Sequence, residues 1–184
     1  GTNTVGEAVK VTTGGVSLGV NLNPNNACNW RCIYCKVPEL KRGAAPAIDM
    51  GRLETELRTF LQEILHGSFM QTQVPAEARC INDIALSGNG EPTSAREFER
   101  VIDLVGQVTR DFDLPRELKL VLITNGSLID RHNVQAGLRR MAELNGEVWF
   151  KLDSVTRAGR QRINNTRMSL QRMRDNLRLA GSLC

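Results

Sequence analysis

The chain has 184 residues, of which 41% are hydrophobic and 24% charged, and its net charge is +4. This is an ordinary globular composition with enough apolar residues for one sizeable core, so we expect a single domain over residues 1–184. No apolar run reaches the roughly 18 residues that a membrane span needs, and the first ten residues lack the apolar segment of a secretory signal, which predicts a cytoplasmic protein with no membrane partner.

Four apolar, β-branched stretches are typical of buried strands, and we expect strands at 15–22, 81–88, 118–126 and 147–154. Apolar residues at helical spacing follow each stretch. Ser94, with Glu97 three residues later, is expected to cap the second helix. The four helical stripes are Ile48, Leu53, Leu57, Leu61, Ile64 and Leu65; Phe98, Val101, Ile102, Val105 and Val108; Val134, Leu138 and Met141; and Leu170, Met173 and Leu177.

The repeated order of strand and helix predicts an α/β fold with a parallel sheet, either doubly wound or part of a barrel. Both architectures bind ligands at the carboxyl ends of the strands, so we expect the chemistry directly after each strand. After the fourth helix only "AGSLC" remains, which is too short for another strand and helix. We therefore expect the last strand and helix units of a barrel to be missing from this chain. Because residue 1 is Gly and not Met, we also expect the chain to be part of a longer gene product.

Three cysteines, Cys28, Cys32 and Cys35, lie within eight positions directly after the first predicted strand. The chain has five cysteines in all, and an odd number without a secretion signal argues against a disulfide framework and for metal binding or catalysis. Clustered thiolates bind a soft metal or an iron–sulfur cluster, whereas a structural zinc site usually has four ligands. Three thiolates suit a four-iron cluster in which one iron has no protein ligand. Trp30, inside the same loop, is expected to pack against its surroundings.

A glycine-rich turn, "SGNGEPT", follows the second predicted strand and is expected at the same sheet edge. Gly88 and Gly90 let the backbone approach a ligand closely because glycine has no Cβ. Glu91 adds a carboxylate that suits an ammonium group. Taken alone, this turn is also explained by a tight connection between a strand and a helix.

Together the two motifs resemble those of a known family. "CNWRCIYC" resembles the Cys-x3-Cys-x2-Cys signature of radical S-adenosylmethionine (radical SAM) enzymes, and "GNGEP" resembles that family's Gly-Gly-Glu-Pro motif, with Asn89 in place of a glycine. The resemblance implies a partial (β/α) barrel of the radical SAM type with four to six parallel strands. It also implies a [4Fe-4S] cluster on Cys28, Cys32 and Cys35, with S-adenosyl-L-methionine (SAM) on the fourth iron.

The resemblance further implies how SAM is held and used. An electron donor such as flavodoxin or ferredoxin reduces the cluster, and SAM is cleaved to a 5′-deoxyadenosyl radical that abstracts hydrogen from a substrate. The implied SAM contacts are Tyr34 at the adenine; Gly88, Asn89, Gly90 and Glu91 at the amine; and Thr124, Asn125, Gly126, Lys151, Asp153 and Ser154 along the ribose and carboxylate.

The substrate is open to several hypotheses. Segments 15–35 and 151–165 are faintly similar to wyosine-type tRNA-modifying enzymes, and the seven arginines from Arg157 to Arg178, with Asp175 as the single acid, would suit an RNA backbone. A solvated or covered helix face also explains these arginines. An activase of a glycyl radical enzyme, with a protein substrate, is a second hypothesis. The alternative from another class is a non-catalytic metal-binding or redox-sensing module that uses the three thiols.

Overall fold

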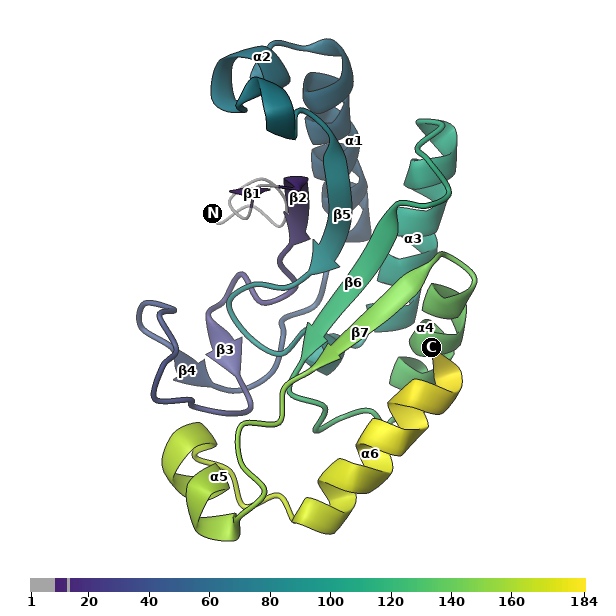
Figure 1. Cartoon of the computed structure of the whole chain (residues 1–184). Helices are drawn as coiled ribbons and strands as arrows, with labels where there is room; N and C mark the ends of the chain where they lie inside the picture. Colours follow the sequence, from purple (N-terminus) through teal and green to yellow (C-terminus); the bar gives the residue numbers. More distant parts are fainter. Residues whose placement is uncertain (1–8, 13) are drawn as a thin grey trace.

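A computed structural model describes residues 9–12 and 14–184; residues 1–8 and 13 of the predicted single domain lie outside this described part. Its main sheet has five strands in the order β1-β2-β5-β6-β7 (Figure 1). The predicted parallel α/β fold is confirmed, because the four expected strands pair in parallel and leave an open sheet, as in a partial barrel. These strands are β2 (Gly15–Val20), β5 (Ile81–Leu86), β6 (Lys119–Thr124) and β7 (Gly146–Phe150).

Four longer helices match the predicted stripes. Helices α1, α3 and α4 lie behind the sheet in Figure 1, and α6 runs along the β7 edge in contact with α4. None of the described helices is long and apolar enough to cross a membrane, and the cytoplasmic location stays a prediction. The four helices are α1 (Met50–His66), α3 (Phe98–Asp111), α4 (His132–Ala142) and α6 (Leu170–Leu183).

Shorter elements were not predicted. An antiparallel strand, β1, pairs with β2, and a two-stranded ribbon of β3 and β4 lies within the segment that carries the cysteines. These elements are β1 (Lys10–Thr12), β3 (Ala27–Cys28), β4 (Lys41–Arg42), α2 (Phe69–Gln73), α5 (Arg157–Asn164) and the 3₁₀ turns Ala76–Ala78 and Pro92–Ser94.

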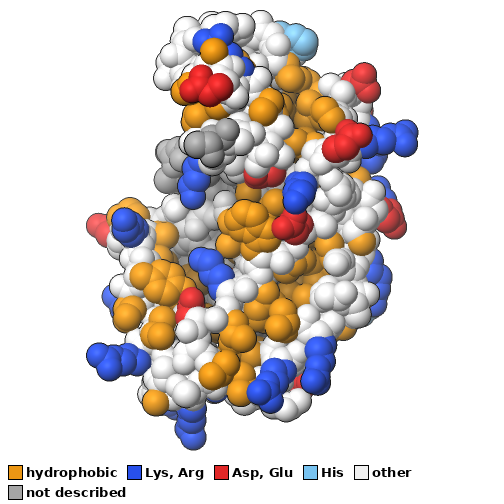
Figure 2. All heavy atoms as spheres, viewed as in Figure 1, with side chains coloured by type: hydrophobic (Ala, Val, Ile, Leu, Met, Phe, Trp, Pro, Cys, Tyr) orange, Lys and Arg blue, Asp and Glu red, His pale blue; other side chains and the backbone are white. Residues whose placement is uncertain are grey.

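The core lies between the sheet and the helices. Because side chains alternate along a strand, Leu120 and Leu122 of β6 pack into this core, while Ile123 lines a cavity on the other side. Phe98, the first residue of α3, belongs to the same core from the helix side and is fully buried. Figure 2 shows hydrophobic side chains spread over the face of the sheet that is opposite these helices.

Three local predictions were wrong. Ser94 does not cap α3: it ends a 3₁₀ turn and its hydroxyl donates to the Glu91 carbonyl oxygen at 2.7 Å, and α3 begins only at Phe98. Leu65 and Leu177 are 38% and 43% exposed rather than buried. Leu65 follows the buried Ile64 and Leu177 follows the buried Asn176. One further residue turns a helix by about 100°, which moves the side chain away from the buried face.

The strands are also shorter than predicted. β5 ends at Leu86, two residues before the expected end, and Gly88 has a φ of 151° that a strand does not allow. β7 ends at Phe150 instead of at residue 154. The residues with the expected chemistry therefore lie in loops directly beyond the strand ends.

Candidate active site

The carboxyl ends of the parallel strands surround a cavity of about 490 Å³, which we call the cysteine cavity. Its walls come from the cysteine loop (residues 21–42), the glycine loop (residues 87–91) and the ends of β6 and β7, as the strand order predicts. The lining residues are Lys10, Cys28, Trp30, Cys32, Tyr34, Cys35, Lys36, Val37, Leu40, Ser87, Gly88, Asn89, Gly90, Glu91, Ile123, Thr124, Asn125 and Lys151.

All three thiols of the cysteine loop are free and line this cavity, with Cys28 and Cys32 half-buried and Cys35 exposed. Burial raises the pKa of the Cys28 thiol, a backbone hydrogen bond from Trp30 opposes the shift, and nearby Glu91 raises the pKa further. Among the described residues, no three His, Cys, Asp or Glu side chains gather closely enough to hold one metal ion. The donor set fits an iron–sulfur cluster, in which each thiolate binds a different iron.

Two glycines let the glycine loop pack against the cysteine loop. A Cβ on Gly88 would lie 2.3 Å from Asn21 Oδ1, and a Cβ on Gly90 would lie 2.1 Å from the Ala27 carbonyl oxygen. Both distances are too short for any side chain, so glycine is required at both positions. Between them, the Asn89 N–H donates to Asn21 Oδ1 at 3.1 Å. Its side chain also has a place, because Asn89 Nδ2 donates to Asn26 Oδ1 at 2.8 Å, so the loop accommodates Asn89 where the family has glycine.

Glu91 is 2% exposed and joins two strand ends. Its Oε1 accepts hydrogen bonds from Thr93 Oγ1 at 2.6 Å and Thr124 Oγ1 at 2.5 Å, and its Oε2 accepts one from the Asn125 N–H at 2.7 Å. Burial raises the pKa of Glu91, and these donors oppose the shift. Within the described part of the chain, Oε2 has this single partner, which leaves it able to accept a bond from a cation in the cavity.

Asn29, between the first two cysteines, ties the cysteine loop to the loop after β6. Its Oδ1 accepts a hydrogen bond from Asn125 Nδ2 at 2.9 Å, and its Nδ2 donates to Ser127 Oγ at 2.7 Å. Asn29 was not among the predicted site residues, although its place inside the cysteine motif was a usable signal. Trp30 packs as predicted, with 4% of its surface exposed.

The segment after β7, residues 151–165, holds the other side of the cysteine loop, and we call it the clasp. The Arg31 and Ile33 N–H groups donate to the last two carbonyl oxygens of α5, at 3.1 and 2.8 Å. Tyr34 Oη donates to Asp153 Oδ2 at 2.6 Å. Partial burial and this hydrogen bond raise the pKa of Tyr34. The clasp therefore fixes the backbone on both sides of Cys32.

Not all predicted site residues line the cavity. Lys151 does, with its Nζ 5.9 Å from the centre of the Tyr34 ring. The described lining does not include Asp153, Ser154 or Gly126. Asp153 is bonded to Tyr34, and Ser154 Oγ accepts from the Thr156 N–H at 3.2 Å, at the start of α5.

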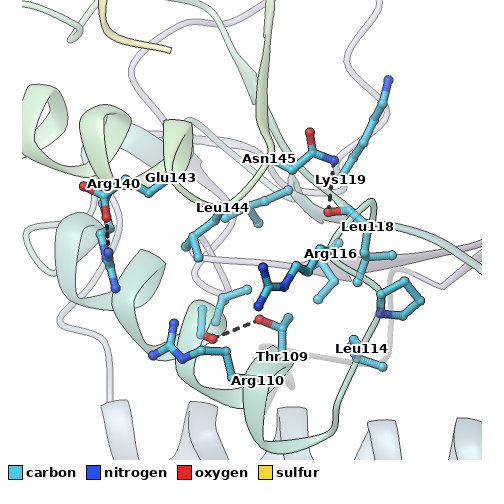
Figure 3. A pocket seen from close by; sticks show the side chains of 15 residues that line it. Thr109, Arg110, Leu114, Arg116, Leu118, Lys119, Arg140, Glu143, Leu144 and Asn145 are labelled. Carbon is cyan, nitrogen blue, oxygen red and sulfur yellow. Dashed lines mark hydrogen bonds and ion pairs between the residues drawn. The ribbon is translucent and has the colours of Figure 1, made fainter.

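A second cavity, of about 370 Å³, opens at the amino ends of the strands and is drawn in Figure 3. Most of its polar side chains are at least partly exposed. Arg140 of α4 pairs with Asp103 of α3 at 2.7 Å and with Glu143, the residue directly after α4. Nearby, Asn145 Nδ2 donates to the Glu117 carbonyl oxygen at 2.7 Å. No cysteine is among its described lining residues, and ligands of parallel sheets bind at the opposite end.

Comparison of the sequence with profiles of known families identifies the family. A profile of the Radical SAM superfamily matches residues 22–183, nearly the whole chain. The chain belongs to the Radical SAM superfamily. Membership makes it part of an enzyme family with radical chemistry. The thiols and the glycine loop, which carry the two motifs that resemble those of the family, line one cavity.

Relatives of this radical SAM chain are longer proteins. It is 28% identical to UPF0026 protein MJ1312 of Methanocaldococcus jannaschii (77% of this chain, 37% of the relative) and 26% identical to UPF0026 protein slr1464 of Synechocystis (82% and 48%). It is also 24% identical to a GTPase Obg of Brachyspira hyodysenteriae (67% and 16%). The chain thus spans less than half the length of these relatives. No solved structure was found to match it.

Proposed function

We propose that this chain is the catalytic core of a radical SAM enzyme in which Cys28, Cys32 and Cys35 hold a [4Fe-4S] cluster. The observation that carries the proposal is the pairing of three free thiols with the buried Glu91 in one cavity. Three thiolates leave one iron without a protein ligand. A chelating small molecule in the cysteine cavity can occupy that position.

We assign SAM to this cavity. Glu91 Oε2 supplies an acceptor for the methionyl ammonium group, and the backbone at Gly88–Gly90 can approach the ligand closely. Thr124 and Asn125 hold the Glu91 carboxylate in place from the neighbouring strand end. Tyr34 and Lys151 line the same cavity, where the adenine and the carboxylate need partners. The direct contacts expected of Asp153 and Ser154 stay a prediction.

A cluster held by Cys28, Cys32 and Cys35 would supply one electron, and SAM in the cysteine cavity would supply the radical hydrogen-abstracting chemistry of the family. The chain's own residues position these groups and keep water away. Trp30, in the cysteine loop, is almost fully buried, and its apolar ring helps to exclude water from the wall that carries the thiols. The electron comes from an external carrier such as flavodoxin or ferredoxin.

Anaerobic reconstitution with iron and sulfide tests this function. We expect a brown protein that, once reduced with dithionite, converts SAM to methionine and 5′-deoxyadenosine. The same protein without reconstitution is the control. A colourless protein that holds zinc and leaves SAM intact would instead support the non-catalytic metal-binding module.

The substrate class stays a prediction. The structure shows which of the seven arginines between Arg157 and Arg178 are exposed to a substrate such as RNA. Arg160 is 3% exposed and donates to the Val155 carbonyl oxygen at 2.8 Å, so it serves the fold. The other six are exposed, and one of them, Arg172, pairs with Asp130 at 2.9 Å. Salt-dependent binding of tRNA would support the wyosine-type hypothesis. Radical transfer to a glycyl radical enzyme would support the activase hypothesis instead.

A further inference from the structure

Asn164, the last residue of α5, is 1% exposed and donates to two acceptors in the site. Its Nδ2 lies 3.2 Å from Cys32 Sγ and 2.6 Å from Asp153 Oδ2, so each amide hydrogen has its own acceptor. Its Oδ1 is buried and has no hydrogen-bond partner within the described chain. An unpaired buried carbonyl oxygen costs stability. The favourable interactions of the Asn164 side chain are therefore its two donated hydrogen bonds.

The orientation of the amide is determined by its neighbours. A thiolate and a carboxylate both accept hydrogen bonds, so the NH₂ end of Asn164 has to face them. Asp153 is itself held by Tyr34, whose Oη donates to the same Oδ2 at 2.6 Å. The hydrogen bond to Asp153 therefore holds one N–H of the Asn164 amide, while the other N–H is directed to Cys32.

The distance between donor and sulfur is also fixed through the backbone. The Asn164 carbonyl oxygen accepts the Arg31 N–H at 3.1 Å, and the Ile163 carbonyl oxygen accepts the Ile33 N–H at 2.8 Å. These two bonds lie on either side of Cys32 in the sequence. The end of α5 and the cysteine loop thus form one rigid unit around the N–H···S contact.

We propose that Asn164 is a positioning residue whose hydrogen bond to the Cys32 thiolate raises the reduction potential of the cluster. This inference rests on the proposed function, because it requires a cluster on Cys32. Reduction adds negative charge to the cluster and its sulfur ligands, and an N–H donor stabilises that added charge. One hydrogen bond to a charged acceptor changes an equilibrium by about tenfold, which equals about 59 mV for a one-electron couple.

The test is a redox titration of the reconstituted protein, followed by the electron paramagnetic resonance signal of the reduced cluster. Asn164→Leu removes both donors at similar volume, and we expect unchanged iron and sulfide content with a midpoint about 59 mV more negative. Asn164→Asp also loses the donor and adds a negative charge, so its shift has the same sign and is larger. Asn176→Leu is the matched control, because Asn176 is a buried asparagine that donates to the Gly126 carbonyl oxygen instead of a thiol.

Each outcome is decisive. A wild-type midpoint in both fully loaded Asn164 variants, or an equal shift in Asn176→Leu, would overturn the inference. Loss of iron from both Asn164 variants but not from the control would show that Asn164 holds the cluster loop together and does not set the reduction potential, which would also overturn the inference. A wild-type protein that takes up no cluster would refute the proposed function itself, which separates that failure from the others.

Discussion

The two cavities at opposite ends of the sheet hold their polar side chains in different ways. Around the cysteine cavity, buried groups from distant parts of the sequence bond to one another, as Glu91 does to Thr124. Around the second cavity (Figure 3), Arg140 pairs with acids on exposed helix surfaces. Exposed ion pairs contribute little, whereas buried bonds between loops hold reactive groups in fixed positions. Catalytic machinery is therefore expected at the first cavity alone.

The largest effect should come from the cysteine loop. Cys32→Ala removes one of three proposed cluster ligands, and we expect it to abolish the cluster, measured as iron and sulfide content after reconstitution. Cys80→Ala is the control, because Cys80 is also a free thiol but lies outside the described lining of the cysteine cavity. A full cluster in Cys32→Ala, or its loss in Cys80→Ala, would contradict the ligand assignment.

The next effect concerns SAM. Glu91→Gln keeps the size of the side chain but removes its charge, and we expect a cluster-loaded protein whose SAM affinity falls about tenfold to hundredfold. Equilibrium binding of SAM to the unreduced protein measures this. Thr93→Val removes one bond to the carboxylate at 2.6 Å but keeps the charge, so it should lower stability and affect SAM binding less. Equal affinities for Glu91→Gln and wild type would exclude the ammonium contact.

A smaller effect is expected from the contact between the glycine loop and the cysteine loop. In Gly90→Ala the new Cβ would lie 2.1 Å from the Ala27 carbonyl oxygen, and we expect a loss of about 1–3 kcal/mol in the free energy of unfolding. Gly181→Ala meets nothing within 4 Å on helix α6, so it should stabilise by about 0.5–1 kcal/mol. Urea denaturation distinguishes the two, and similar results would refute the close packing of the loops.

The fold was predictable because it depends on apolar periodicity. The strands around Leu18, Ile84, Leu122 and Val148 and the helical stripes lie where the pattern placed them. The strand ends were placed too late because Gly88 can adopt a backbone conformation that hydrophobicity does not reveal. The antiparallel strand β1 has three exposed residues, so no burial pattern indicated it.

The candidate site was predictable only where residue type carries chemistry. Thiols and a carboxylate after consecutive strands indicated Cys28 and Glu91. Asn29 and Asn164 escaped prediction because an asparagine has no distinctive spacing, and its role depends on which loops the fold brings together. The SAM contact expected of Asp153 stays a prediction. The hydrogen bonds from Tyr34 and Asn164 to its carboxylate were not predicted, because Tyr34 lies more than a hundred positions away in the sequence.

The smallest effect should come from the second cavity. Arg140→Ala removes ion pairs to Asp103 and Glu143, whose side chains are 53% and 63% exposed, and we expect it to lower stability by about 1 kcal/mol or less, with the difference vanishing at high salt. Cluster content and SAM affinity should equal those of the wild type. A fall in either property would mean that the two ends of the sheet are coupled and that the second cavity takes part in the chemistry. Comparing Arg140→Ala with Glu91→Gln therefore tests which end of the sheet is functional. It shows whether function follows the buried hydrogen bonds between loops or merely the presence of polar residues around a cavity.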